Sequence, residues 1–166
     1  MRTAYQSSLG TDMPPPVSAW LSRPTRGKAS WINRKPRTID PLANLIMVAH
    51  KAKGMLELPD NWDDAGSPAI RRDTFLRALL LLLLHAALIL MRHSVVIPTP
   101  RISPGPDGSI DLHWKTRRRE LLISIPQDLR EPAAYYGDNF GSDKKKGAIQ
   151  PNVLDLELFA WLAIVD

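Results

Sequence analysis

The chain has 166 residues, of which 44% are hydrophobic and 23% charged, and this composition suits one soluble domain with a sizeable core. It contains no cysteine, which excludes disulfides, cysteine-ligated zinc, iron–sulfur clusters and a cysteine nucleophile. The net charge of +5 is uneven: residues 1–39 hold seven Lys or Arg and one acid, which leaves 15 basic and 16 acidic groups for residues 40–166. We therefore expect a basic, Pro-rich arm over 1–39 and a single domain over 40–166.

The arm has no periodic apolar pattern, so it cannot bury enough apolar area to offset the entropy of ordering it. Basic groups alternate with tryptophans there, which suits stacking on nucleic-acid bases, docking on a protein partner, or simply a solvated tail. The first residues lack the apolar run of a secretory signal, and we expect a cytoplasmic protein. The arm residues that we expect to contact a partner or nucleic acid are Arg23, Arg26, Lys28, Trp31, Arg34, Lys35 and Arg37.

Two helices are predicted after the arm. Asp40-Pro41 is a helix-start pattern, and the apolar spacing that follows predicts a helix over about 41–53 that ends at Gly54. Ser67-Pro68 repeats the start pattern, and we expect the second helix to run from there through Met91.

The second helix contains an unusually apolar stretch, residues 78–91, with one His and no charge. A membrane span needs about 20 apolar residues, and shorter runs are more typical of buried core, so we expect no membrane association. A helix that is apolar all round must be covered on several sides. The candidates for that cover are the first helix, a sheet and a second subunit, which makes an oligomer one of the expected states.

The remainder of the chain predicts strands. Alternating or extended apolar residues mark four segments, 97–104, 110–115, 121–125 and 133–136, with a turn at Pro106-Asp107-Gly108. We expect residues 137–147 to form a mobile polar loop and Asn152 to cap a last helix. The fold class is α+β: two helices packed on a three- to four-stranded antiparallel meander, with a closing C-terminal helix and a flexible basic arm.

No pattern of catalytic residues is present. The four histidines follow no metal-ligand spacing, and His85 is best explained as a core residue with a backbone partner. Asp60, Asp63 and Asp64 could hold Mg²⁺ or Ca²⁺, but Asp also shapes turns, which is the interpretation we prefer. We expect no cofactor, no metal and no catalytic residues. The basic turn Arg117, Arg118 and Arg119 and the run Lys144, Lys145 and Lys146 join neighbouring strands or follow them, so we expect the two to lie near each other. Together with the arm they could form a phosphate-contacting face, or they could serve only solvation and edge protection.

Two blocks carry a resemblance to a known kind of protein. Residues 58–70, LPDNWDDAGSPAI, and residues 100–114, PRISPGPDGSIDLHW, resemble patterns of small uncharacterised proteins of bacteria and their mobile elements. The likeness covers roughly residues 56–140 and implies an architecture, since that family has no established activity. It implies structural roles for its marker residues, Trp62, Asp63, Gly66, Pro68 and Trp114. The sequence departs from the pattern at Asp64, Ala65 and Ser67.

These observations together favour a non-enzymatic accessory or adaptor subunit that acts through protein–protein contacts in a bacterial or mobile-element system, with an antitoxin-like or complex-subunit role. The alternative is a nucleic-acid-binding subunit that uses the basic arm. A metal-assisted hydrolase built on Asp60, Asp63 and Asp64 is the third hypothesis.

Overall fold

The computed structural model describes residues 41–141, 143–150 and 153–163. They belong to the second of the two units into which the chain divides, Ile39–Asp166. The predicted arm and its contact residues lie outside the described residues. The elements in chain order are α1 (Ala43–Ala52), the 3-10 helix η2 (Lys53–Glu57), α2 (Arg72–His93), β1 (Arg101–Pro104), β2 (Ile110–Lys115), β3 (Glu120–Ile125), β4 (Ala133–Asp138), β5 (Lys144–Ile149) and α3 (Leu156–Ala163).

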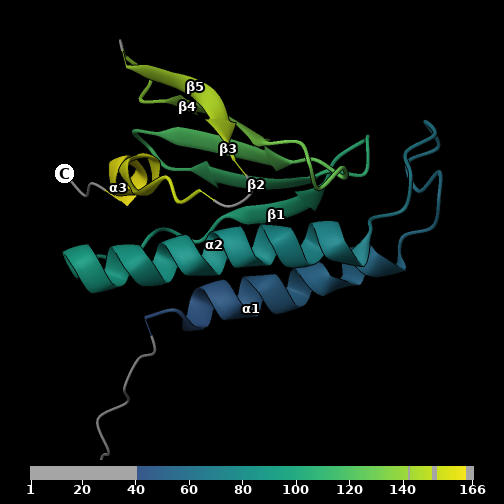
Figure 1. Cartoon of the computed structure of the whole chain (residues 1–166), viewed down its shortest axis with the longest axis horizontal. Helices are drawn as coiled ribbons and strands as arrows, with labels where there is room; N and C mark the ends of the chain where they lie inside the picture. The colour runs from purple at the N-terminus through teal and green to yellow at the C-terminus, as the bar shows by residue number, and fades with distance from the viewer. Residues whose placement is uncertain (1–40, 142, 151–152, 164–166) are drawn as a thin grey trace, which may run out of the picture. The chain divides into compact units, whose positions relative to one another are not determined.

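The five strands form one sheet in the order of the sequence, and every neighbouring pair is antiparallel (Figure 1). Side chains alternate between the two faces of a sheet, so the register decides which residues share a face. One row across all five strands consists of Arg101, His113, Leu122, Tyr136 and Lys146. We call the side that carries this row the outer face.

The opposite, inner face of the sheet carries the core. β2 and β3 contribute only apolar side chains there, all fully or almost fully buried: Ile110, Leu112, Trp114, Leu121, Ile123 and Ile125. Burying each such side chain contributes roughly 1.5–3 kcal/mol. Phe159 of α3 joins the layers, because its ring packs edge-on against Trp114 and stacks on His85 of α2. The predicted α+β class is therefore confirmed, with an antiparallel sheet and three α-helices among the described residues.

The sheet has one strand more than the predicted three or four. The segment that we expected to be a mobile loop forms β5, which pairs with β4 from Asp138↔Lys144 to Ala133↔Ile149. Gly147 lies opposite Tyr135, and a Cβ there would come within 2.8 Å of the Tyr135 hydroxyl oxygen. The strand therefore depends on a Gly and a run of Lys, which are residues that strand propensity disfavours.

The helix boundaries also differ from the prediction. α2 begins at Arg72 rather than at Ser67, because Ser67 donates its hydroxyl and its backbone N–H to Asp63 and is not a helix cap. The first helix is close to its prediction, since α1 covers Ala43–Ala52 against the predicted 41–53, but a 3-10 turn, η2, follows it to Glu57 in place of an end at Gly54. The predicted capping residues Asp40 and Asn152 lie outside the described residues. Among those described, Asp155 accepts the Leu158 N–H at 3.0 Å and caps α3.

Candidate functional site

The connector between η2 and α2 contains the block that carries the resemblance. The Asp63 carboxylate accepts the N–H groups of Ala65 and Ser67, both at 3.1 Å, and the Ser67 hydroxyl. The Ser67 hydroxyl is the largest of the causes that lower the pKa of Asp63, and partial desolvation opposes it. Asp60 likewise accepts the Ala69 N–H at 2.7 Å. These two carboxylates therefore bind the backbone of their own turn.

The other marker residues of the resemblance, Gly66, Pro68, Trp62 and Trp114, occupy positions in turns or in the packed interior. Gly66 adopts a φ of 91°, a conformation that Gly reaches without the strain of a side chain. The ring of Pro68 lies beside the β1–β2 turn, near Gly108, and Trp62 is half-buried. Trp114 is buried, and its indole N–H donates to the Pro98 carbonyl at 2.8 Å. Within the described ranges, no group of three or more His, Asp or Glu is placed to hold a metal ion.

The apolar helix α2 has two different sides. Its core side is formed by Thr74, Phe75, Ala78, Leu82, His85, Ala86 and Ile89. Its opposite side exposes four large apolar side chains, Leu76, Leu80, Leu84 and Met91, which we call the α2 stripe. Leu80 is 65% exposed and Met91 is 79% exposed, so the other described residues leave them uncovered. By length and composition alone α2 could also cross a membrane, a test that core helices of soluble proteins pass too.

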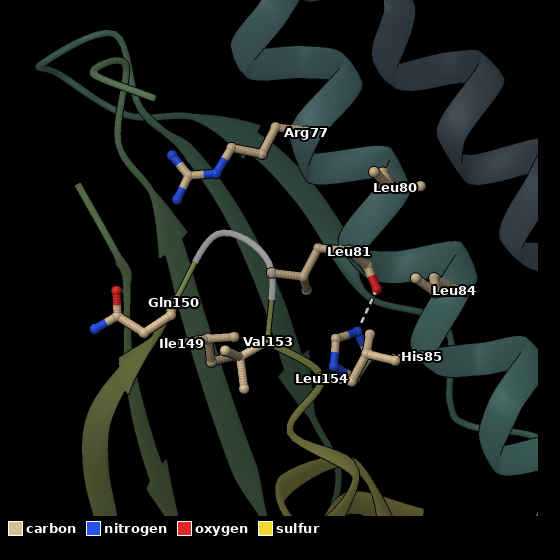
Figure 2. Close-up of a pocket in the computed structure, with 9 residues that line it drawn as sticks. All are labelled: Arg77, Leu80, Leu81, Leu84, His85, Ile149, Gln150, Val153 and Leu154. Atoms are coloured by element: carbon tan, nitrogen blue, oxygen red, sulfur yellow. Dashed lines mark hydrogen bonds between the residues drawn. The ribbon is translucent and has the colours of Figure 1, made fainter. Parts of the chain in front are cut away.

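A cavity of about 270 Å³ borders the α2 stripe (Figure 2). Leu80 and Leu84 form one wall, and Val153 and Leu154, both exposed, form the other. Arg77 lies at one end, but its guanidinium extends away from these leucines and donates to the carbonyls of Asp128 and Glu131, at 3.3 and 2.6 Å. The cavity is therefore an apolar groove whose nearby positive charge already has partners.

His85 lies at the base of this groove and links α2 to α3. Its Nε2 accepts the Asp155 N–H at 3.0 Å, so the neutral ring donates from Nδ1 to the Leu81 carbonyl at 2.7 Å. Burial lowers the pKa of His85, and the Leu81 carbonyl and the Asp155 charge only partly oppose this effect. These contacts confirm the predicted role of a core histidine with backbone partners.

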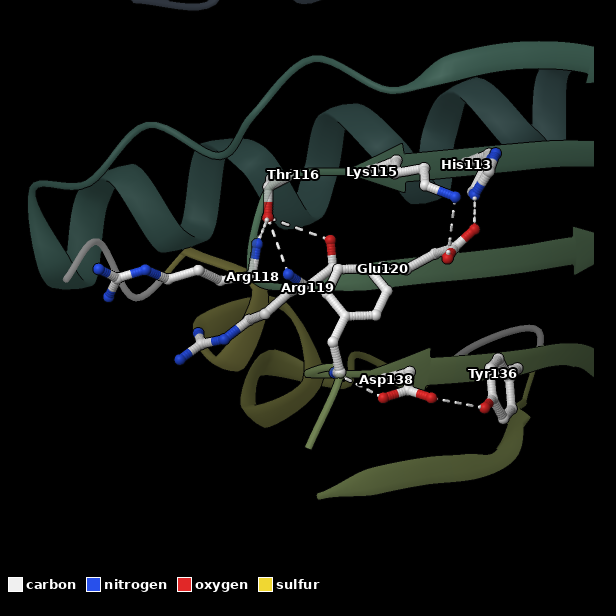
Figure 3. Close-up of polar contacts among 9 residues, drawn as sticks. His113, Lys115, Thr116, Arg118, Arg119, Glu120, Tyr136 and Asp138 are labelled. Atoms are coloured by element: carbon white, nitrogen blue, oxygen red, sulfur yellow. Dashed lines mark hydrogen bonds and ion pairs between the residues drawn. The ribbon is translucent and has the colours of Figure 1, made fainter. Parts of the chain in front are cut away.

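The outer face of the sheet is polar and internally paired (Figure 3). Glu120 accepts from His113 at 2.7 Å and lies 3.4 Å from the Lys115 ammonium. The His113 contact is the main reason that the pKa of Glu120 is lowered. On β4, the Tyr136 hydroxyl donates to Asp138 at 2.9 Å, which raises the pKa of Tyr136.

Two basic segments meet at one end of the sheet. Arg119 of the β2–β3 hairpin donates to the Trp161 carbonyl, and its guanidinium lies 5.3 Å from the centre of the Trp161 ring. Lys145 of β5 lies 5.9 Å from the same ring centre. The predicted proximity of the Arg117–Arg119 turn and the Lys144–Lys146 run is therefore confirmed. Trp161 of α3, at their centre, carried no signal in the sequence beyond its place in an apolar helix.

A scan against family models finds no match for this chain, and neither the curated proteins nor the solved structures give one. The candidate sites are therefore identified from the geometry of the described residues alone. Of the predicted contact residues, the structure brings the hairpin arginines Arg117, Arg118 and Arg119 to one end of the sheet beside the lysines, and the arm residues lie outside the described part.

Sequence reasoning missed that α2 divides into a covered and an uncovered side. The signal available was that the leucine run supplies more apolar positions than one core-facing side of a helix requires. The α2 stripe and its groove form the candidate site for a protein partner. The basic end of the sheet is a second candidate, for an anionic one.

Proposed function

We propose that this protein is a non-enzymatic accessory or adaptor subunit that acts through protein–protein contact, with the α2 stripe as its contact surface. The observation that carries the proposal is the exposure of Leu76, Leu80, Leu84 and Met91 on one side of a single helix, beside an apolar groove. Exposed apolar patches on protein surfaces are often functional and mark interaction sites. The resemblance of residues 56–140 supports a bacterial or mobile-element setting.

The test is the mass of the native assembly. The full chain is purified under native conditions after co-expression with the products of its neighbouring genes, and its complexes are weighed by native mass spectrometry. We expect the wild-type chain in an assembly larger than one chain, and we expect Leu80→Glu to run as a single folded chain. Leu129→Glu is the matched control, because Leu129 is also exposed, at 45%, but lies in the β3–β4 connection.

Two results would contradict the proposal. One is a Leu80→Glu variant that keeps the wild-type assembly. The other is a wild-type chain that is monomeric and hydrolyses a nucleotide or a nucleic acid.

The basic end of the sheet supports nucleic-acid binding as a second candidate function. The β2–β3 hairpin, with Arg117, Arg118 and Arg119, and the start of β5, with Lys144 and Lys145, lie at the same end of the sheet, and Arg119 and Lys145 flank the Trp161 ring. Contacts to phosphates release counterions, so affinity should fall steeply with salt. A chain lacking residues 1–39 and an Arg117→Ala/Lys144→Ala variant should each bind single-stranded DNA more weakly and with a smaller salt slope. Binding that is insensitive to salt would remove this candidate.

A further inference from the structure

β5 is an edge strand of the sheet, and no described strand lies on its outer side. It pairs with β4 only, and it lies at the open edge of the sheet in Figure 1. The other edge is better protected, because β1 has four residues, ends in Pro104 and packs beside α1. β5 has six residues and no Pro. An edge strand of this kind presents unpaired backbone N–H and C=O groups, to which another strand can bind.

The hairpin that joins β4 to β5 shows which residues present these groups. The Asn139 N–H donates to the Asp143 carbonyl at 3.2 Å. Bonded and non-bonded pairs alternate along an antiparallel ladder, so Lys144, Lys146 and Ala148 direct their backbone N–H and C=O groups away from β4. The side chains of the same three residues lie on the outer face of the sheet and are exposed. The open edge therefore combines unpaired backbone groups with two ammonium groups.

The lysine side chains leave positive charge at this edge. The ammonium groups of Lys144 and Lys145 each lie 3.9 Å from a carboxylate, of Asp138 and Asp143 respectively, which is a long separation for an ion pair. Lys146 is exposed and forms no ion pair with the described residues. Opposite charges on neighbouring strands stabilise a strand pair, whereas like charges destabilise it. The edge is therefore suited to a strand that carries carboxylates.

We propose that β5 binds an extended acidic segment of a partner protein, which pairs with it as an added strand. This inference goes beyond the proposed function, because it places a second partner contact on a surface that does not include the α2 stripe. The two other candidates for the edge are themselves basic. A second copy of β5 would bring two lysine runs into the same strand pair, and residues 1–39 hold seven basic groups and one acid.

The added strand is recognised through its backbone and through every second side chain. Its backbone bonds to the outward groups of Lys144, Lys146 and Ala148, and these bonds give affinity whatever the sequence. Side chains alternate between faces, so every second residue of the added strand lies beside the lysines on the outer face. Lysines on an edge strand discourage pairing with unselected strands. Glu or Asp at alternate positions, with Thr or Val between them, is therefore the chemistry that this edge selects.

A capped synthetic peptide of alternating Glu and Thr is the probe, and fluorescence anisotropy measures its binding to the purified full chain. We expect binding that saturates and that weakens as salt is added, because salt screens the charges at an exposed edge. A capped peptide of alternating Lys and Thr is the matched control and should not bind. A wild-type chain that binds neither peptide, or binds both equally well, overturns the proposal.

Two substitutions separate the backbone contact from the charge contact. Ala148→Pro removes one outward N–H, a change that an edge strand tolerates where the N–H faces solvent. It should weaken peptide binding roughly fivefold, the effect of one lost hydrogen bond, whereas Ala148→Ser keeps the N–H and should bind as the wild type does. Lys146→Glu should weaken binding roughly tenfold, because it repels the peptide carboxylates. Circular dichroism establishes that each variant is folded.

Methylation of the probe tests the backbone contact without altering the protein. Alternate N–H groups of a bound strand face its partner, so methylation of one alternate set of peptide nitrogens should abolish binding and methylation of the other set should not. Equal effects of the two sets overturn strand pairing.

The remaining outcomes separate this inference from its alternatives. Single-stranded DNA is bound through its phosphates, so its binding should respond to Lys146→Glu and not to Ala148→Pro. Peptide binding that follows the same pattern is binding by charge alone and overturns the added strand. Leu80→Glu lies on the α2 stripe and should bind the acidic peptide as the wild type does, so the proposed function and this inference can fail independently.

Discussion

Two surfaces that the described residues leave uncovered, the outer face of the sheet and the α2 stripe, differ in kind. On the outer face of the sheet, several polar groups find partners within the face, as Glu120 does in His113 and Lys115. On α2, the outward surface is made of leucine and methionine side chains that the described part of the chain leaves between 39% and 79% exposed. The outer face is compatible with water as it stands, whereas the α2 stripe leaves apolar area in water that another surface could bury.

The difference supports the proposed contact surface on α2. A sheet face that carries ion pairs gains little from being covered, because those ion pairs would have to be desolvated. An apolar stripe gains free energy in proportion to the area that a partner removes from water. This contrast is the physical reason for placing the protein contact on α2 rather than on the open side of the sheet.

The largest expected change in the free energy of unfolding comes from comparing two leucines on opposite sides of α2. Leu82 is 0% exposed, and Leu82→Ala leaves a cavity that should lower the free energy of unfolding by about 2–5 kcal/mol. Leu80 lies two residues away on the stripe, and Leu80→Ala should lower it by less than about 1 kcal/mol, since Ala also favours helix. Urea denaturation at a concentration where the chain is monomeric measures both. Equal losses would mean that the stripe is covered within one chain.

An intermediate effect on the free energy of unfolding is expected from the titration of His85, which lies beneath the groove. Burial lowers its pKa below the ordinary 6.5, so the unfolded chain takes up a proton before the folded chain does. The free energy of unfolding should therefore be highest above pH 6.5 and fall as the pH drops from there to the folded-state pKa. One proton gives a slope of at most about 1.4 kcal/mol per pH unit.

Denaturation midpoints measured at intervals between pH 7.5 and 5.5 would show this slope. His85→Asn is the matched control, because its side-chain oxygen can still accept the Asp155 N–H but does not titrate. Subtracting its profile from that of the wild type isolates the His85 contribution. A difference that stays constant with pH would contradict the assigned neutral form.

The contrast also shows how much of the molecule could be predicted from sequence. Local patterns predicted the antiparallel strands of β2 and β3 and the Pro106-Asp107-Gly108 turn, because alternation and turn chemistry depend on neighbours in the chain. They also predicted that His85 is a core residue and that the basic turn and the Lys run lie near each other. Each of these predictions required only the spacing of apolar residues, the residues of a turn or the order of the strands along the chain.

The features that could not be predicted depend on tertiary position. Leu80 and Leu82 are both leucines and lie two positions apart on one helix. Only the location of the sheet makes Leu80 exposed and Leu82 buried. β5 forms from Lys and Gly because β4 offers it a partner and the Tyr135 ring occupies the space beside Gly147. Ser67-Pro68 has the sequence pattern of a helix start, but the Ser67 hydroxyl donates to Asp63 instead, a contact that the sequence pattern does not reveal.

The smallest effect is expected on the outer face, from Glu120→Gln. The pKa of Glu120 is lowered, mainly by His113, so its contribution to stability is present above its ordinary value of 4.5 and is lost as the pH falls through the folded-state value. Its side chain is 26% exposed, and solvent screens such pairs, so the variant should be less destabilised than Leu82→Ala and the difference from wild type should shrink with added salt.

The same Glu120→Gln variant should leave the mass of the assembly unchanged, because Glu120 lies on the outer face of the sheet and not on the α2 stripe, which is the proposed contact surface. Thermal denaturation at low and high salt and sedimentation equilibrium measure the two properties separately. Ser124→Ala, on the same face, is the control for a polar change without an ion pair. A loss of the assembly in Glu120→Gln would place the protein contact on the sheet and reverse the assignment of the two surfaces.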